Sequence, residues 1–139
     1  MPTSTRWYTG TKLGCSDRQL RVQRVDSPGP GNVLLVSLAF EHVTELFCGF
    51  GQRGVRAETV AARTVAEARR YLDADVPVGQ HLADQLLLPM ALAGGGSFRT
   101  QPLTPHTRTN MEVIKRFIDV RMESRELEDG STLVEVEAG

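Results

Sequence analysis

The hydrophobic positions in the first half of the chain predict a strand hairpin followed by a helix. Two apolar runs, residues 32–40 and 43–47, are rich in β-branched and aromatic residues and flank the polar pair Glu41-His42. This pattern is typical of a hairpin with a tight turn. Over residues 56–72, apolar side chains recur at helical spacing and charged side chains take the other face, which predicts an amphipathic helix.

The second half of the chain predicts the order helix, strand, helix, strand, strand. Residues 81–93 are apolar almost all the way round and stop at three glycines, so we expect a helix that is buried on most sides. Residues 97–101 follow as a short strand. The capping-box sequence at 109–112 predicts that the next helix starts near residue 109. Alternating residues at 120–126 and 132–137 predict a closing hairpin.

Composition and charge exclude several classes of protein. The 139 residues carry 16 Lys and Arg against 17 Asp and Glu, so a generic polyanion binder with a basic tail is excluded. No apolar run approaches the roughly 20 residues of a membrane span, and no membrane partner is expected. The first ten residues lack the features of a signal peptide, which favours a cytoplasmic location. Cys15 and Cys48 have no metal-binding spacing and are expected to be reduced thiols.

Two polar residues, Asp84 and Gln85, interrupt the apolar segment 81–93. Each needs a partner if it is buried, because an unpaired buried polar group costs about 1–3 kcal/mol. The simplest interpretation is a helix start that still faces solvent. His81 precedes the pair by three and four residues, so all three side chains can share one helix face and converge on one ligand.

His106 is the second candidate for chemistry, because it lies just before a predicted helix start. Backbone N–H groups and the helix dipole favour an anion such as phosphate there, and they disfavour imidazolium. A neutral imidazole keeps the lone pair that an attack on phosphorus requires. Arg99 and Arg108 are placed to steady phosphate charge. A lone histidine at a helix start is more often a surface or capping residue, so the residues alone leave both interpretations open.

Four sequence stretches and the closing hairpin, between about Arg21 and Glu137, share a pattern with one known family. The stretches are PGPGN (28–32), AETVA (57–61), VGQHLADQLLLPMALAGGG (78–96) and HTRTN (106–110). On these segments the chain resembles the C-terminal portion of the RNA 3′-terminal phosphate cyclases. The third stretch is long and specific enough that chance is a poor explanation.

The resemblance implies an α+β fold and a division into two parts. Residues 75–139 would be the C-terminal part of a catalytic domain built from repeated βαβαββ-type units. Residues 1–74 would be the latter part of a small thioredoxin-like domain inserted in the last unit. The chain begins inside the family pattern, so activity of this chain alone is left open. Self-association, or a need for the missing N-terminal portion, is expected to follow from exposed apolar surface.

The resemblance also implies a reaction of the ligase class. Such cyclases convert an RNA 3′-terminal phosphate into a 2′,3′-cyclic phosphate with ATP, through a covalent histidine–AMP intermediate. By the resemblance, His106 matches the nucleophile, and a nucleotide-contacting segment is matched by His81, Leu82, Ala83, Asp84 and Gln85. Asp84 is left with three roles, to orient the imidazole, a metal or the ribose, and Gln85 with two, to donate to a phosphate or to the base. A divalent metal, usually Mg²⁺, would screen the triphosphate, but its ligands are unknown.

Two other functions remain open. Some proteins similar to the cyclases are non-catalytic, RNA-associated factors in ribosome biogenesis and lack the nucleophile, so the presence of His106 argues against this function. The enolpyruvyl transferases resemble the cyclases in fold. The segments at 81–85 and 106–110 favour the cyclases over them.

Overall fold

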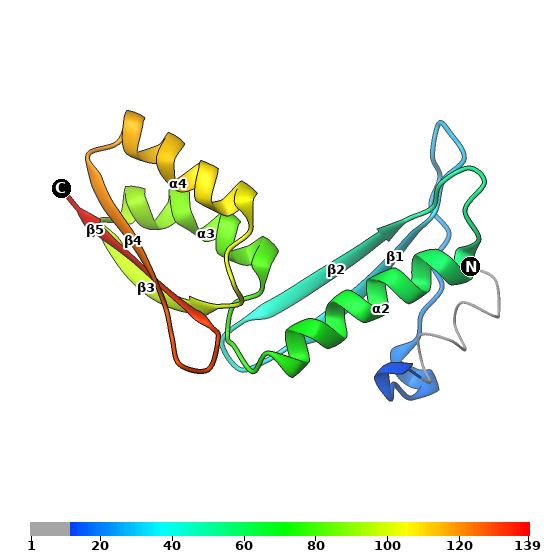
Figure 1. Ribbon diagram of the computed structural model, residues 1–139. Helices are drawn as coiled ribbons and strands as arrows, with labels where there is room; N and C mark the ends of the chain where they lie inside the picture. Colours follow the sequence, from blue (N-terminus) through cyan, green and yellow to red (C-terminus); the bar gives the residue numbers. More distant parts are fainter. Residues whose placement is uncertain (1–11) are drawn as a thin grey trace. The chain divides into compact units, whose positions relative to one another are not determined.

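The structure of the protein, a computed structural model, describes residues 12–139 and divides into two compact units (Figure 1). The first unit contains the described residues up to Phe40 together with Leu46–Arg70, and the second contains Glu41–Glu45 and Tyr71–Gly139. Helices and sheets occur in both units, in agreement with the expected α+β class. The N-terminal ten residues, in which no signal peptide is recognised, lie outside the described residues.

The first unit is a long helix beside a two-stranded sheet (Figure 1). A 3₁₀ turn, η1 (Asp17–Gln19), precedes the paired strands β1 (Val33–Ala39) and β2 (Thr44–Phe50), and α2 (Ala57–Asp73) follows. Alternate strand residues and one stripe of the helix are buried, as amphipathic elements require. The predicted hairpin and helix are confirmed to within a few residues. Buried apolar side chains include Leu34, Val36, Phe47, Ala61, Val65 and Ala68.

The second unit is a three-stranded sheet with two helices on one face (Figure 1). Its elements occur in the predicted order: α3 (Gln80–Ala93), β3 (Gly95–Thr100), α4 (Pro105–Phe117), β4 (Val120–Glu126) and β5 (Thr132–Ala138). The strand order is β3-β5-β4 and both pairs are antiparallel. The last strand in sequence is therefore the central strand of the sheet.

One hydrophobic core joins the two helices of this unit to the inner face of the sheet. Leu87 of α3 and Val134 of β5 are its fully buried centre, each with 0% exposure. The outer face of the sheet is polar and carries the ion pair of Arg121 with Glu123 at 2.7 Å. The alternation of strand residues thus separates core from solvent. Other core members are Val78, Ala83, Ala91, Phe98, Leu103, Met111, Ile114, Val120, Met122 and Val136.

Glycines end α3 and start β3 without an intervening loop. Gly94 caps the helix with a left-handed φ of 90°, a conformation that favours glycine. Gly95 has a φ of 131°, and a Cβ built on it would lie 2.7 Å from the Val136 carbonyl oxygen. Only a residue without a side chain fits there. The predicted helix stop is confirmed, although β3 begins at residue 95 instead of 97.

The predicted start of α4 near residue 109 is wrong. The helix begins at Pro105, and the Thr104 hydroxyl caps it by accepting a hydrogen bond from the Thr107 amide at 3.1 Å. Threonine at the N-cap and proline at the first helical position together outweigh the later capping-box sequence. His106 therefore lies within the first turn of α4 and not ahead of the helix.

The prediction that α3 is buried on most sides is also wrong. Ala83, Leu87 and Ala91 form one buried stripe, whereas Leu88 is 46% exposed and Leu92 is 71% exposed. The cause is geometric, since the sheet and α4 cover only part of the helix circumference. A helix that looks buried in sequence thus presents apolar side chains on its surface in this structure.

Two leucines of α3 test this assignment of faces. Leu87→Ala is expected to lower the free energy of unfolding by about 2–5 kcal/mol, because it opens a cavity in the core. Leu92→Ala is the matched control and is expected to change it by less than about 0.5 kcal/mol. Urea unfolding followed by circular dichroism measures both. Equal losses would show that α3 packs through its opposite side.

Candidate active site

Asp84, His106 and Asn110 form a polar cluster that bridges α3 and α4. The Nδ1 atom of His106 lies 3.1 Å from Oδ1 of Asp84. The Nδ2 atom of Asn110 donates to the same oxygen at 3.0 Å. His106 and Asn110 are four residues apart, so they share one face of α4. One carboxylate oxygen of α3 is thus held between two side chains of α4.

This contact orients the imidazole of His106. The His106 side chain is 80% exposed and that of Asp84 is 23% exposed, so the carboxylate is set into the surface while the ring stands above it. Nδ1 is the ring nitrogen near Asp84, so a neutral ring that carries its proton on Nδ1 has its lone pair on Nε2, the nitrogen away from the carboxylate. Of the three roles open to Asp84, the geometry favours orientation of the imidazole.

The other residues of the expected nucleotide-contacting segment lie in the first two turns of α3. His81 and Gln85 are exposed, Leu82 is half-buried, and Ala83 belongs to the core. His81 lies on the same side of the helix as Asp84 and Gln85, as its spacing predicts. The structure therefore brings His81, Asp84 and Gln85 to the end of α3 that meets His106, while Ala83 serves packing.

The two arginines expected near a phosphate differ in their surroundings. Arg99 lies 3.0 Å from the Asp129 carboxylate and donates to the Asp75 carbonyl at 2.8 Å, so its guanidinium is already engaged. The Ser131 hydroxyl and amide also donate to Asp129 and, with Arg99, hold its pKa below the ordinary value. Arg108 is exposed in the first turn of α4, beside His106. Only Arg108 shares a helix end with the histidine.

The sequence pattern did not single out Glu45, a buried acid at the start of β2. Its carboxylate accepts a hydrogen bond from the backbone amide of Gly79 at 2.6 Å, and only 4% of the residue is exposed. Burial raises the pKa of Glu45, while the Gly79 hydrogen bond and the charge of His81 act in the opposite direction. A signal was available in the sequence, because Glu45 is two residues before the apolar residue Phe47, and residues two apart in a strand lie on the same face.

Metal ligands are not gathered in the part of the chain that is described. No three His, Cys, Asp or Glu side chains within residues 12–139 are grouped so that they could hold an ion. Asp84 is already engaged by His106 and Asn110. Cys15 and Cys48 are free thiols, as expected.

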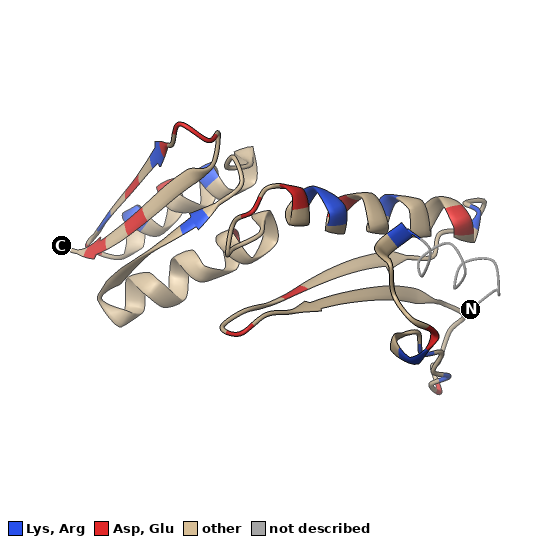
Figure 2. Cartoon of the chain, turned by 90° about the horizontal axis from the view of Figure 1, so that it is seen from below, with Lys and Arg blue, Asp and Glu red and all other residues tan. Residues whose placement is uncertain are grey.

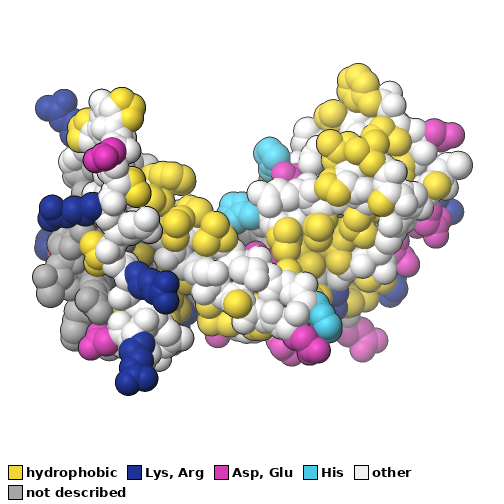
Figure 3. Space-filling view, turned by 180° about the vertical axis from the view of Figure 1, so that it is seen from behind, with side chains coloured by type: hydrophobic (Ala, Val, Ile, Leu, Met, Phe, Trp, Pro, Cys, Tyr) yellow, Lys and Arg dark blue, Asp and Glu magenta, His cyan; other side chains and the backbone are white. Residues whose placement is uncertain are grey.

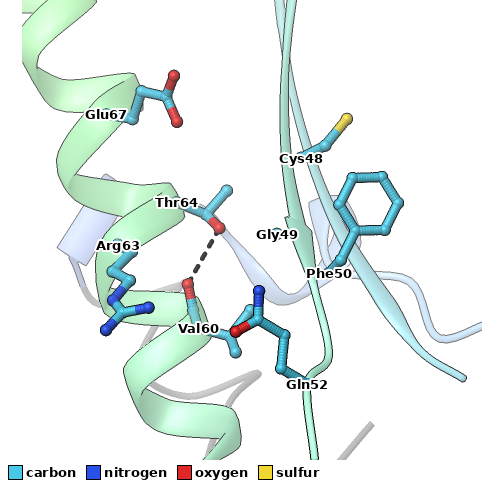
Figure 4. A pocket seen from close by; sticks show the side chains of 8 residues that line it. All are labelled: Cys48, Gly49, Phe50, Gln52, Val60, Arg63, Thr64 and Glu67. Carbon is cyan, nitrogen blue, oxygen red and sulfur yellow. Dashed lines mark hydrogen bonds between the residues drawn. The ribbon is translucent and has the colours of Figure 1, made fainter. Parts of the chain in front are cut away.

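A groove in the first unit is lined by β2, its following loop and α2 (Figure 4). The Thr64 hydroxyl there donates to the Val60 carbonyl at 3.0 Å, so it is used within the helix. None of the residues expected to carry chemistry lines this groove. The lining residues are Cys48, Gly49, Phe50, Gln52, Val60, Arg63, Thr64 and Glu67.

Charges on the described surface do not form a basic track. Arginines are interspersed with acidic residues along α2 (Figure 2), which agrees with the net charge of −1. Non-specific attraction to a polyanion is therefore weak. Separately, none of the helices within residues 12–139 combines the length and apolar character needed to cross a bilayer.

Comparison with known proteins identifies the family to which the chain belongs. The model of the family described as RNA 3′-terminal phosphate cyclase matches residues 11–124, which is most of the chain. The protein belongs to the RNA 3′-terminal phosphate cyclase family. This confirms the resemblance carried by the segments at 78–96 and 106–110, and it decides against the enolpyruvyl transferases.

Curated cyclases from several bacteria are similar to the chain over part of their length. The RNA 3′-terminal phosphate cyclase of Pseudomonas fluorescens is 59% identical over 101 residues, which cover 73% of this chain and 30% of the relative. That of Pseudomonas aeruginosa is 44% identical over 120 residues, which cover 86% of this chain and 35% of the relative. That of Salmonella enteritidis is 49% identical over 102 residues, which cover 73% of this chain and 30% of the relative. The chain thus spans about a third of the length of the curated relatives it matches.

Nitrogen chemical shifts can test the orientation of His106. In the parent protein the neutral ring is expected to carry its proton on Nδ1, because Asp84 accepts it. In Asp84→Asn the new amide group can donate to Nδ1, so the proton is expected to move to Nε2. ¹⁵N NMR of the histidine ring at alkaline pH distinguishes the two tautomers. His42, which is exposed, is the internal control, and an unchanged His106 tautomer in the variant would contradict the assignment.

Proposed function

We propose that this chain is the C-terminal part of an ATP-dependent RNA 3′-terminal phosphate cyclase in which His106 accepts AMP. The observation that carries the proposal is the contact of His106 Nδ1 with Asp84, which leaves an outward Nε2 on a highly exposed ring. Membership of the cyclase family supports the reaction. ATP and an RNA with a 3′-terminal phosphate are the substrates, and the reaction belongs to the ligase class.

In the first step the Nε2 lone pair of His106 attacks the α-phosphorus of ATP. A nitrogen–phosphorus bond forms, the bond from that phosphorus to the bridging oxygen breaks, and pyrophosphate leaves with the electron pair. The ring keeps its proton on Nδ1 and becomes positively charged. Asp84 faces that proton and stabilises the developing charge, which is the electrostatic assistance that a fixed carboxylate gives.

The next two steps return the histidine to its neutral form. An oxygen of the RNA 3′-phosphate attacks the phosphorus of AMP and breaks the nitrogen–phosphorus bond. The vicinal 2′-hydroxyl then attacks the 3′-phosphorus and loses its proton, and AMP leaves as the 2′,3′-cyclic phosphate closes. His81, Leu82, Ala83, Asp84 and Gln85 form the segment that we assign to the nucleotide, with His81 and Gln85 as its exposed side chains.

Magnesium enters this proposal only as an ion carried on the triphosphate oxygens, a common way for Mg²⁺ to bind with nucleotides. The residues described do not supply a ligand set of their own, and none of the steps above is assigned to the ion. A cytoplasmic location and the assignment of residues 1–74 and 75–139 to an inserted thioredoxin-like domain and a repeated catalytic domain are parts of the same proposal.

Covalent labelling tests the role of His106. Incubation of the chain with ATP and magnesium is expected to add the mass of one AMP group, and His106→Ala is expected to abolish the adduct because the attacking nitrogen is gone. His42→Ala is the control and is expected to label like the parent. Intact-mass spectrometry measures all three. The adduct should survive alkali and be released by acid, since it is a phosphoramidate.

Equal labelling of His106→Ala and the parent would overturn the assignment. If the parent does not label by itself, the experiment is repeated with the Pseudomonas fluorescens cyclase truncated to lack the region that this chain matches. Continued absence of the adduct would favour the non-catalytic, RNA-associated role in ribosome biogenesis.

The site continues into an exposed apolar face. Leu88 and Leu92 follow Asp84 at intervals of four along α3, and Val113 and Phe117 follow Asn110 along α4. These four side chains are 46%, 71%, 46% and 84% exposed, and Figure 3 shows hydrophobic side chains gathered over this unit. We propose that the N-terminal portion of a cyclase covers this face, because the matched relatives are about three times as long as the matched segment.

Substitution of its apolar side chains by glutamine tests what covers the exposed apolar face of α3 and α4. Leu92→Gln and Phe117→Gln are expected to weaken binding of the truncated Pseudomonas fluorescens cyclase in analytical ultracentrifugation, because each removes apolar area. Val25→Gln, 74% exposed at another place in the chain, is the control. Concentration-dependent dimers of the parent that both α3 and α4 variants abolish would show that a second copy covers the face instead.

A further inference from the structure

The connection that leads into α3 is held by contacts with distant parts of the second unit. The Tyr71 hydroxyl donates to the Pro77 carbonyl at 3.2 Å. The Gln80 side chain donates to the Pro102 carbonyl at 3.2 Å. Between these two contacts lies Gly79, the N-cap of α3, which has no side chain with which to cap the helix. The first turn of α3 therefore depends on groups supplied from elsewhere.

Glu45 supplies the missing group. In a local capping box, an acid at the third helical position accepts a hydrogen bond from the N-cap amide. That position in α3 is Leu82, which cannot accept one. The Glu45 carboxylate takes its place and accepts from the Gly79 amide at 2.6 Å. Glu45 and Gly79 belong to the same compact unit although they are 34 residues apart in sequence.

The Glu45 carboxylate packs closely against Gly79. A Cβ built on Gly79 would lie 2.9 Å from Oε2 of Glu45. The φ of Gly79 is −78°, which any residue can adopt. A side chain at position 79 would therefore be limited by the Glu45 carboxylate, which would have to move, and not by the backbone conformation.

Burial disfavours the charged form of the Glu45 carboxylate. Tyr71 and His81 are the titratable groups that interact with Glu45. Because burial raises the pKa of Glu45 above its ordinary value of 4.5, the folded protein loses stability as the pH rises through that raised value.

We infer that Glu45 is a positioning residue for the proposed active site. It holds the first turn of α3 through the Gly79 amide, and so it fixes His81 and Asp84 relative to His106. Its catalytic consequence rests on the proposed function, whereas its structural consequence does not. Glu45 lies outside the segments at 81–85 and 106–110 that carry the expected site residues.

Three variants of the full chain test the inference by NMR. Glu45→Ala removes the acceptor, Glu45→Gln keeps an acceptor oxygen without the charge, and Glu41→Gln is a control at an acid whose side chain is 86% exposed. In Glu45→Ala we expect the Gly79 amide to lose its protection from hydrogen exchange and the His106 ring nitrogens to shift. In Glu45→Gln and Glu41→Gln we expect both signals to stay near those of the parent.

The pH dependence separates the charge from the hydrogen bond. In the parent, the Gly79 amide proton is expected to titrate with Glu45 at a pH above 4.5. That titration should vanish in Glu45→Gln and persist in Glu41→Gln. The free energy of unfolding of the parent, relative to Glu45→Gln, should fall as the pH rises from 4.5, following the sign given above.

The rate of AMP labelling gives the catalytic consequence. Misplacement of reacting groups by about 1 Å costs up to about a hundredfold in rate, and we expect Glu45→Ala to label about ten- to a hundredfold more slowly than the parent. Glu45→Gln should restore most of the rate, which a mere loss of folded protein would not explain.

The outcomes for Glu45 and for the proposed function are distinguishable. Unchanged Gly79 exchange and unchanged His106 shifts in Glu45→Ala overturn the positioning role, whatever the labelling shows. If Glu45→Ala does not fold, Gly79→Ala replaces it, since the added Cβ displaces the same carboxylate, and the same two signals decide. If Gly79 exchange and the His106 shifts both change in Glu45→Ala, but the parent does not label with AMP either alone or with the truncated Pseudomonas fluorescens cyclase, the positioning role is supported and the proposed function is rejected.

Discussion

The register between α3 and α4 depends on one carboxylate oxygen, Oδ1 of Asp84. It meets both His106 and Asn110, which lie one turn apart on α4. A single acceptor can satisfy both only if the two helices keep their axial positions. The core beneath, centred on Leu87, fixes the distance between the helices but not this register, because apolar contacts are non-directional. The polar bridge therefore adds specificity to a pairing that packing alone leaves loose.

Much of the fold and of the candidate site was predictable because the information is local. The period of the apolar residues predicted the hairpin of the first unit and α2 to within a few residues, and the glycines at 94–96 predicted where α3 ends. The spacing of His81, Asp84 and Gln85 placed them on one side of a helix. Membership of the cyclase family was predictable from the segment at 78–96, whose length makes chance matches rare.

The rest was not predictable because it depends on competition or on distance. Two capping signals compete at the start of α4, and Thr104 with Pro105 outweighs the later one, a balance that sequence spacing does not reveal. The exposure of Leu92 depends on how much of α3 the neighbouring elements cover. The contact of Asp84 with His106 and the hydrogen bond of Glu45 with Gly79 join residues that lie 22 and 34 positions apart. The period of the apolar residues and the local sequence motifs do not show which residues far apart in the chain come into contact.

The strand order β3-β5-β4 has a consequence for the synthesis of the protein. Within the sheet, both outer strands pair with β5, which is the last of the three to be made. While the ribosome is still translating β5, neither β3 nor β4 has a partner in this sheet, and α3 and α4 have no completed surface on which to pack. The sheet of the second unit therefore cannot be completed before β5 emerges. Chaperones would meet its apolar helices during that interval, and a slow codon before β5 would prolong it.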